Sequence, residues 1–362
     1  MSIKDPGKAV TLEHIIEKVG RDISCLGEVM PSKAGFEEAL ESLVKDGMVS
    51  RDAKGFKRRS TLDAFVRGFV ASKRGSLNRS YYLVYIAERF YPSVSTSMLQ
   101  FLTKKPLSAV KVFSGKRDPI NEVEPIFVRY SRYKPKPIHL EIRSESDLMD
   151  LVHDHCVDFV PYVHGFDGRP DIFLVDLDLG GSLSESVEGF SVAKEAAALV
   201  SLILNEKGCH PQIKFSGNRG FQVLCRMSYE GTAMGFPELR AAVRAIREEL
   251  ELRLRDAEVS RRYRGLGMGE PYTTSDVGDK GVRSRKILVD WSSMKPSGDY
   301  RAPLSLHYRT GLVSLPLETT ELPSFRKEDA DPFLIMAKGK DYASLKSLPA
   351  TTWDALAAVA SA

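Results

Sequence analysis

Two aspartates at alternate positions near the end of an apolar segment are the feature that most constrains this chain. The segment runs from Asp171 to Gly180, and a single leucine separates Asp176 from Asp178. Alternate residues of a β-strand point to the same face, so a strand here places both carboxylates side by side. Adjacent carboxylates repel each other unless a cation lies between them, and hard oxygen ligands suit Mg²⁺ or Mn²⁺. Helix capping or plain solvation is the alternative for so short a motif.

A second apolar segment, at 285–291, carries Asp290 near its end. Three carboxylates from two strands can build a two-metal site, in which one ion activates a primer 3′-hydroxyl and the other neutralises the triphosphate and the leaving pyrophosphate. Phosphoryl transfer needs chiefly this positioning and charge neutralisation, so no other general base is required. Taken alone, Asp290 is more typical of a turn residue at a strand end.

Two polar segments carry groups that suit phosphate. In the first, a strand breaks at Ser216 and Gly217, presents Asn218 and Arg219, and resumes after a second glycine. Glycine lets a ligand approach the backbone, while hydroxyl and guanidinium groups donate hydrogen bonds to phosphate oxygens. By itself, such a turn is more typical of an ordinary hairpin.

The second polar segment, at 300–313, gathers several donors before an apolar run: Arg301, Ser305, His307, Arg309 and Thr310. A cluster of this kind can hold a triphosphate. A lone histidine would be more typical of a structural residue, and only its neighbours favour a role in binding.

Beyond residue 150, apolar runs alternate with helical stretches, which predicts an α/β or α+β domain with a mixed sheet and flanking helices. The expected strands lie at 171–177, 212–215, 221–225 and 286–291, and the expected helices at 191–205 and 237–256. We expect a catalytic domain at 61–345 and a tail at 346–362 that forms a short helix. No motif can be assigned between 61 and 140.

Residues 1–60 predict a winged-helix-like module, in which helices precede a hairpin with its turn near 52–55. The helix that would enter a DNA groove carries Glu37, Glu38 and Glu41, which phosphates would repel. Protein contact or structural support is therefore favoured over groove binding for this module.

Composition adds limits but no function. The formal charge is +4, so any nucleic-acid surface must come from local clusters of Lys and Arg. The 4 cysteines are scattered, which fits a reducing compartment. Charged residues interrupt every apolar run before it could span a membrane, and no signal pattern opens the chain. We expect a cytoplasmic protein, associated with the nucleoid if the source is prokaryotic, with no membrane partner.

Taken in order, these segments resemble the archaeo-eukaryotic primase superfamily, which includes the catalytic small subunit of primases and the primase-polymerases. That family carries D-x-D on a strand, then S-G-x-R-G-x-H, then a strand-borne Asp followed by R-x-P-x-S-x-H-x-K-T-G. In this chain the motifs stand at 176–178, 216–222, 290 and 301–311. The resemblance covers roughly 150–320 and implies a primase-type catalytic fold.

The resemblance also implies site residues and cofactors. Asp176, Asp178 and Asp290 would hold two Mg²⁺ or Mn²⁺ ions. The phosphates of the incoming nucleoside triphosphate would be held by the other two motifs: Ser216, Gly217, Asn218, Arg219, Gln222, Arg301, Ser305, His307 and Arg309.

Two departures from the family pattern matter. Gln222 stands where the family has histidine, so this position can donate a hydrogen bond but never carry charge. Arg309 replaces a lysine, which keeps the charge but favours bidentate contacts. We predict no zinc: Cys209 and His210 are too few for a knuckle, and the run at 153–156 places its side chains in diverging directions.

The implied function is template-directed nucleotidyl transfer by a DNA-directed primase or polymerase (EC 2.7.7 type), acting on a single-stranded DNA template and primer. Primer synthesis, primer extension, and end-joining or gap-filling repair stay open within the family. A large primase subunit or another replication or repair protein could be a partner. A non-catalytic nucleic-acid-binding or replication-complex module is the alternative of another class. A nuclease would leave the donors at 301–311 unexplained.

Overall fold

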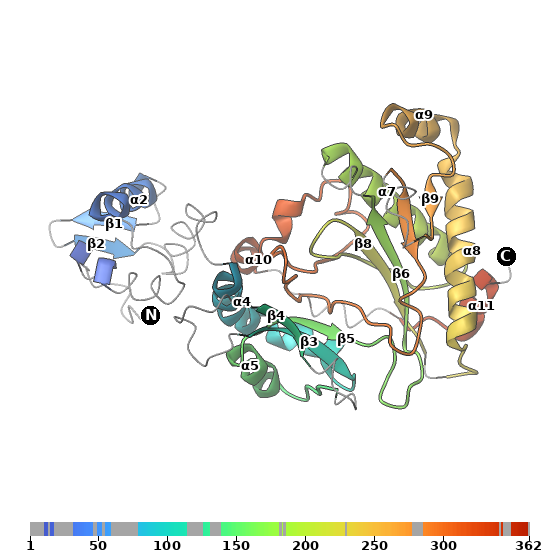
Figure 1. The fold of residues 1–362 in the computed structure, drawn as a ribbon, viewed down its shortest axis with the longest axis horizontal. Helices are drawn as coiled ribbons and strands as arrows, with labels where there is room; N and C mark the ends of the chain where they lie inside the picture. Colours follow the sequence, from blue (N-terminus) through green and yellow to red (C-terminus); the bar gives the residue numbers. More distant parts are fainter. Residues whose placement is uncertain are drawn as a thin grey trace. The chain divides into compact units, whose positions relative to one another are not determined.

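The structure, a computed structural model, describes residues 11–13, 15–17, 32–45, 49–52, 55–58, 79–113, 126–130, 139–180, 183, 186–228, 230–276, 285–339, 342 and 349–360. The chain divides into two compact units (Figure 1). The first comprises Met1–Tyr85 and Val112–Phe127, and the second comprises Ile86–Lys111 and Val128–Ala362. The predicted boundaries at 60 and 345 lie outside the described residues, so the three-part division of the chain stays a prediction.

The first unit contains helix α2 (Lys33–Lys45) and a hairpin of β1 (Val49–Asp52) and β2 (Gly55–Arg58). Phe36 and Leu40 lie one helical turn apart and are fully buried. Residues 12–13 and 15–17 are also helical. The helical pattern and the hairpin agree with a winged-helix-like module, although residues 53–54 of the predicted turn lie outside the described residues.

The centre of the second unit is a mixed sheet with the strand order β11-β7-β8-β6-β10-β9. Its strands are β6 (Ile172–Leu179), β7 (Gln212–Phe215), β8 (Phe221–Arg226), β9 (Thr273–Thr274), β10 (Ile287–Asp290) and β11 (Pro316–Leu317). Only β9 and β10 pair in parallel among these neighbours. The predicted mixed sheet and each predicted strand are confirmed.

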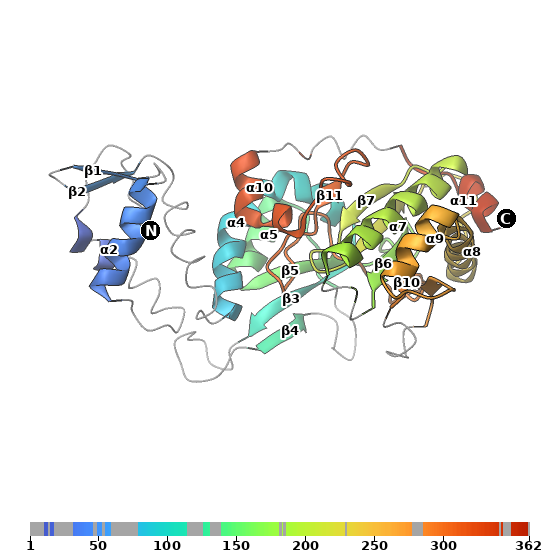
Figure 2. The same cartoon turned by 90° about the horizontal axis from the view of Figure 1, so that it is seen from above.

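One face of this sheet is covered by α7 (Val187–Glu206), which packs across β6, β7 and β8 (Figure 2). The Ser186 side chain accepts a hydrogen bond from the Gly189 amide at 2.8 Å and so starts the helix. Phe190 then packs against Phe215 and Phe221, with ring centroids 5.9 and 5.4 Å apart. Even-numbered positions of β7 and β8 face the opposite side.

Helix α8 (Phe236–Leu254) packs beside α7 and contacts β6, β9 and β10. The second unit also contains α9 (Ala257–Gly265) and α11 (Trp353–Ala360). Pro237 opens α8, where a missing amide proton costs nothing. The predicted terminal helix is confirmed as α11. It packs against α8, and the Trp353 indole donates to the Ser228 carbonyl at 2.9 Å.

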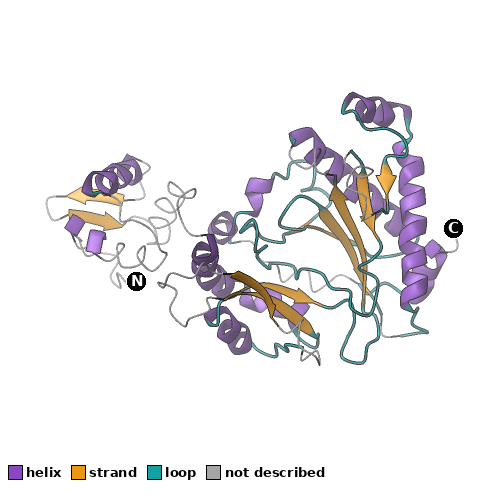
Figure 3. Ribbon diagram, viewed as in Figure 1, coloured by secondary structure: helices purple, strands orange, loops and turns teal. Residues whose placement is uncertain are grey.

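A second sheet has the order β4-β3-β5, formed by β3 (Leu107–Phe113), β4 (Ile126–Tyr130) and β5 (Cys156–Pro161) (Figure 3). Around it lie α4 (Arg79–Leu102) and α5 (Glu145–His153), and the chain later forms the short helices η1 (Lys327–Ala330) and α10 (Pro332–Lys338). The aromatic run that carried no assignment is the start of α4. The run at 153–156, for which no zinc was predicted, spans the end of α5 and the start of β5. None of the described helices is long and apolar enough to cross a membrane.

Candidate active site

Asp176 lies on the central strand β6, between an acidic neighbour and an amide neighbour. In the antiparallel pairing of β6 with β10, Asp176 is directly opposite Asp290. In the pairing of β6 with β8, Asp176 is opposite Gln222. Opposite residues of an antiparallel pair share a face, with Cβ atoms about 4.5–5.5 Å apart. The two aspartates, predicted from separate strands, are therefore brought together.

Asp178 follows two residues later on β6 and shares this face. Its carboxylate accepts hydrogen bonds from the Arg219 guanidinium at 2.7, 3.0 and 2.5 Å. Both side chains are partly exposed, so the ion pair contributes about 1 kcal/mol or less to stability. The arginine predicted to hold phosphate thus contacts a predicted metal ligand.

The electrostatics of Asp176 favour a bound cation. Its pKa is raised to about 7, first by burial and then by the negative charges of Asp178 and Asp290. A hydrogen bond from the Gln222 side chain opposes this shift. A bound cation would offset the neighbouring negative charges and favour the ionised form of this carboxyl group.

Two further side chains continue this row across the sheet, because Lys214 of β7 is opposite Gln222 of β8. Gln222 is 8% exposed, and its Oε1 atom has no hydrogen-bond partner within the described part of the chain. Lys214 is fully buried, and its Nζ donates to the Ser314 hydroxyl at 2.8 Å. Burial and the positive charge of Arg301 lower the pKa of Lys214 to about 7, against the opposing charge of Asp176.

The turn between β7 and β8 fits closely against its surroundings. The Ser216 hydroxyl accepts hydrogen bonds from the amides of Asn218 and Gly220, at 3.4 and 3.3 Å, so it stabilises the turn. A Cβ atom on Gly220 would lie 2.1 Å from a carbonyl oxygen of β6. Gly217 has φ +85°, and a Cβ there would lie 2.8 Å from the Cβ of His307. Both glycines are therefore needed for the turn to approach β6 and the 301–311 segment.

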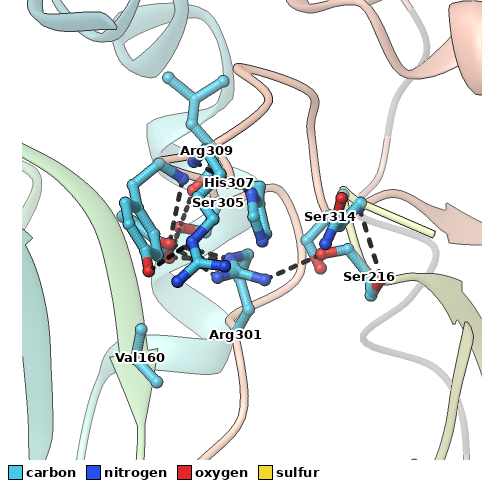
Figure 4. Close-up of polar contacts among 12 residues, drawn as sticks. Val160, Ser216, Arg301, Ser305, His307, Arg309 and Ser314 are labelled. Carbon is cyan, nitrogen blue, oxygen red and sulfur yellow. Dashed lines mark hydrogen bonds and ion pairs between the residues drawn. The ribbon is translucent and has the colours of Figure 1, made fainter. Parts of the chain in front are cut away.

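Arg301 connects the second sheet to this turn (Figure 4). Its guanidinium donates to both carboxylate oxygens of Asp158 at 2.8–3.0 Å, and to the Ser216 carbonyl at 2.9 Å. Asp158 lies on β5 and is completely buried. Removing one partner of a buried ion pair costs about 3–5 kcal/mol. Arg301, predicted as a phosphate ligand, thus also joins the two sheets.

Two other predicted phosphate ligands are buried. Ser305 is fully buried, and its hydroxyl accepts a hydrogen bond from the Phe159 amide at 2.7 Å. His307 is 6% exposed, and its Nδ1 atom accepts from the Arg309 amide at 3.1 Å. These contacts are within the protein, so in this structure both side chains shape the 301–311 segment. Their contact with phosphate stays a prediction.

Arg309 is exposed, in contrast to its neighbours, and its Nε donates to the Tyr308 hydroxyl at 2.9 Å. Nearby, the Thr310 hydroxyl donates to the Gly217 carbonyl. The two polar segments predicted from the sequence are therefore joined to each other. Asn218 and Arg219 are also partly exposed, so these two and Arg309 are the predicted phosphate ligands best placed to meet a ligand.

Side chains of helix α8 contact the segment that follows Asp290. The Arg240 guanidinium of α8 donates to the Met294 carbonyl at 3.0 Å, and Arg244 lies 5.0 Å from the centre of the Trp291 ring. These contacts hold the chain where it leaves β10. The α8 arginines thus support the end of the acidic strand.

Asp158, Lys214 and Tyr91 are not predicted as site residues from the sequence. The signal for the first two is a charged residue inside a short apolar strand, where burial without a partner would be costly. Tyr91 gives no such signal: its hydroxyl donates to the Val157 carbonyl at 2.8 Å and accepts from the Leu306 amide at 3.0 Å. It reaches the 301–311 segment from helix α4.

Comparison with known proteins identifies this arrangement. The model of a family described as LigD, primase-polymerase domain, matches residues 87–338. The chain belongs to this family. The LigD-type fold is also seen in the solved structure titled "Polymerase Domain from Mycobacterium tuberculosis Ligase D in complex with DNA". The similarity covers 72% of this chain and 92% of that one, with a TM-score of 0.54 and 18% sequence identity. No curated protein sequence matches the chain.

Membership of the LigD primase-polymerase family confirms the predicted superfamily and fold. It makes the chain a metal-dependent nucleotidyltransferase of the DNA-directed polymerase and primase type. Among the described residues, no three His, Cys, Asp or Glu side chains lie, as they stand, in an arrangement that could hold a metal ion. Three carboxylates on one face nevertheless offer the oxygen ligands that divalent cations prefer, so these residues suit a divalent metal ion.

Proposed function

We propose that this chain extends a primer strand on a DNA template at breaks or gaps, using nucleoside triphosphates and two Mg²⁺ or Mn²⁺ ions. Asp176, Asp178 and Asp290 would hold the metals. The observation that carries this proposal is the strand register, which sets Asp290 opposite Asp176 with Asp178 two residues along the same face. Hydrolysis by a nuclease would leave the adjoining 301–311 segment without a use.

In the proposed reaction, the primer 3′-oxygen bonds to the α-phosphorus of the nucleotide, the bond to the β-phosphate oxygen breaks, and pyrophosphate leaves. Bound metal ions would lower the pKa of the attacking hydroxyl and offset the charge of the leaving group. The chain's own part is to hold these groups in place. Exposed Arg309 and partly exposed Arg219 are the side chains that offer positive charge to the triphosphate.

Arg219 must change partner for this chemistry to proceed. Its guanidinium occupies both oxygens of Asp178. A metal at Asp178 would displace that contact, and the released guanidinium would be free to bind phosphate. We infer that metal binding and nucleotide binding are coupled through this one ion pair.

Extension at breaks or gaps is favoured over primer synthesis because of the family and the similar structure. The family description refers to LigD, and the similar structure is a polymerase domain of a ligase solved with DNA. A polymerase that serves a ligase would fill a gap before the strand is sealed. A large primase subunit stays a prediction without support from these similarities.

The test is incorporation of labelled ribo- and deoxyribonucleotides on three DNA substrates: a gapped duplex, a primed single strand and an unprimed single strand. Reactions contain Mg²⁺, Mn²⁺ or EDTA, and Asp176→Asn is the inactive control. We expect metal-dependent extension on the first two substrates. Products without a primer would instead establish primer synthesis, and full activity of Asp176→Asn would refute the proposed metal site.

A further inference from the structure

A buried positive charge lies in the same row as the acidic site. Pairing across three strands sets Lys214, Gln222, Asp176 and Asp290 in register, one residue per strand. Their side chains therefore share one face of the sheet. Lys214 is the cation of this row, and none of its surface is exposed.

A fully buried ammonium group is costly unless other charges compensate it. The groups that act on it come from several elements. Asp176 of β6 and Asp158 of β5 favour its charged form, whereas burial and Arg301 oppose it. Among the described residues, its only hydrogen-bond partner is the Ser314 hydroxyl, at 2.8 Å. A single neutral hydroxyl does not compensate a buried positive charge, so the contact with Ser314 alone does not explain a lysine here.

Gln222 lies between this lysine and the acidic site. Its side chain hydrogen-bonds to the Asp176 carboxylate, while its Oε1 atom is without a partner in the described part of the chain. A buried amide oxygen without a hydrogen bond is energetically costly, so this atom can accept a hydrogen bond from a bound ligand. The same position carries histidine in the family pattern, and only histidine of the two can hold a positive charge.

We propose that Lys214 is a positioning residue for the incoming triphosphate, supplying from β7 the positive charge that the family's histidine supplies from β8. Lys214 and Gln222 together then replace one histidine. The Gln222 amide orients the Asp176 carboxylate, and the buried Lys214 ammonium supplies the positive charge. This inference rests on the proposed nucleotide-binding role of the acidic face.

Loss of this charge would act oppositely on the two kinds of ligand. In Lys214→Met, a metal cation near Asp176 no longer meets a neighbouring positive charge, so we expect free Mn²⁺ to bind more tightly. A triphosphate loses an attractive charge in a poorly solvated site, so we expect Mn²⁺–ATP to bind about tenfold more weakly. A merely structural role would weaken both, because a loosened site holds neither ligand well.

The experiment is calorimetric titration of the full chain with Mn²⁺ alone and then with Mn²⁺–ATP. Lys214→Gln is measured beside Lys214→Met, because it keeps hydrogen-bonding capacity and loses only the charge. The matched control is Lys105→Met, which removes another buried lysine, one paired with Asp171 at the far end of β6. We expect this control to lower thermal stability and leave both affinities unchanged.

A second substitution in the Lys214→Met variant gives the decisive test. Adding Gln222→His to Lys214→Met should restore most of the affinity for Mn²⁺–ATP, because it returns the family's own cation to the row. Unchanged Mn²⁺–ATP affinity in Lys214→Met, or no rescue by histidine, would overturn the proposal. Failure of the proposed function is distinguishable: there, Mn²⁺ affinity would be the same in the parent chain and in Asp176→Asn.

Discussion

The two faces of the central sheet use the same strands but opposite kinds of side chain. On the face that α7 covers, Phe215 and Phe221 pack with ring centroids 5.7 Å apart. One residue away on each strand, Lys214 and Gln222 face the other side beside Asp176. One set of alternate positions therefore stabilises the strands through apolar packing. That stability keeps charged groups close together on the other face, despite their mutual repulsion and the cost of burying them.

The first prediction tests whether a substitution on the polar face lowers activity without lowering thermal stability. Asp290→Asn should lower nucleotide incorporation by about 10³-fold or more, because a neutral amide is a poor ligand for a divalent cation. Thermal unfolding should show no loss of stability, since the substitution removes a charge that crowds Asp176. Primer-extension rates measure the first effect. Asp150→Asn, at an exposed position of α5, is the matched control and should be fully active.

The second prediction tests the opposite face. Phe221→Ala should reduce the free energy of unfolding by about 3–5 kcal/mol, because it removes a fully buried ring from the aromatic cluster. Urea unfolding measures this loss. Below the unfolding transition, nucleotide incorporation per folded molecule should stay close to that of the parent chain. A large loss of incorporation with little loss of stability would show that the two faces are not separate in function.

The third prediction uses pH. The pKa of Asp176 is raised from an ordinary value of 3.8 to about 7 in the folded chain. Between these values the folded state keeps a proton that the unfolded state releases, so stability is greatest below the lower pKa and falls as pH rises. The slope contributed by this group is up to about 1.4 kcal/mol per pH unit.

The measurement for this pH effect is the free energy of unfolding in EDTA from pH 4 to 7, for the parent chain and for Asp176→Asn. The difference between the two chains should fall with rising pH, and saturating Mg²⁺ or Mn²⁺ should flatten it at neutral pH. A difference that is independent of pH would show that Asp176 is not crowded as the structure indicates.

The smallest expected effect concerns a change within the polar face. Gln222→His should keep nucleotide incorporation within a few-fold of the parent chain or improve it, because the family pattern carries histidine at this position. Steady-state KM for the nucleotide is the measurement. A folded but inactive variant would mean that the contacts around Gln222 no longer accommodate an imidazole.

Much of the core of this site could be read from sequence spacing. Alternate aspartates on an apolar segment specify one face of a strand, and this placed Asp176 and Asp178 correctly on β6. The pairing of Asp290 with Asp176 could be suggested only by the family pattern, because register depends on which strands become neighbours. The strand assignments around these residues were also confirmed. Short apolar runs bounded by glycine have few structural alternatives to a strand.

The remaining contacts come from positions with no local signal. Asp158 and Arg301 are 143 residues apart in the chain, and neither position indicates the other. The start of α4 carries clustered tyrosines beside aliphatic residues, a pattern to which no element could be assigned from the sequence, and in the structure it is helical. The inward contacts of Ser305 likewise depend on a strand that is remote in sequence.

The order of strands in the central sheet also bears on how the chain is made. Strand β6 is paired with β8, which follows soon after it, and with β10, which is synthesised much later. During translation the β10 side of β6 is therefore an open sheet edge, the kind of surface at which nascent chains aggregate. Charged side chains on an edge strand oppose such association. The charges of Asp176 and Asp178 on β6 therefore disfavour association at this edge until β10 pairs with it.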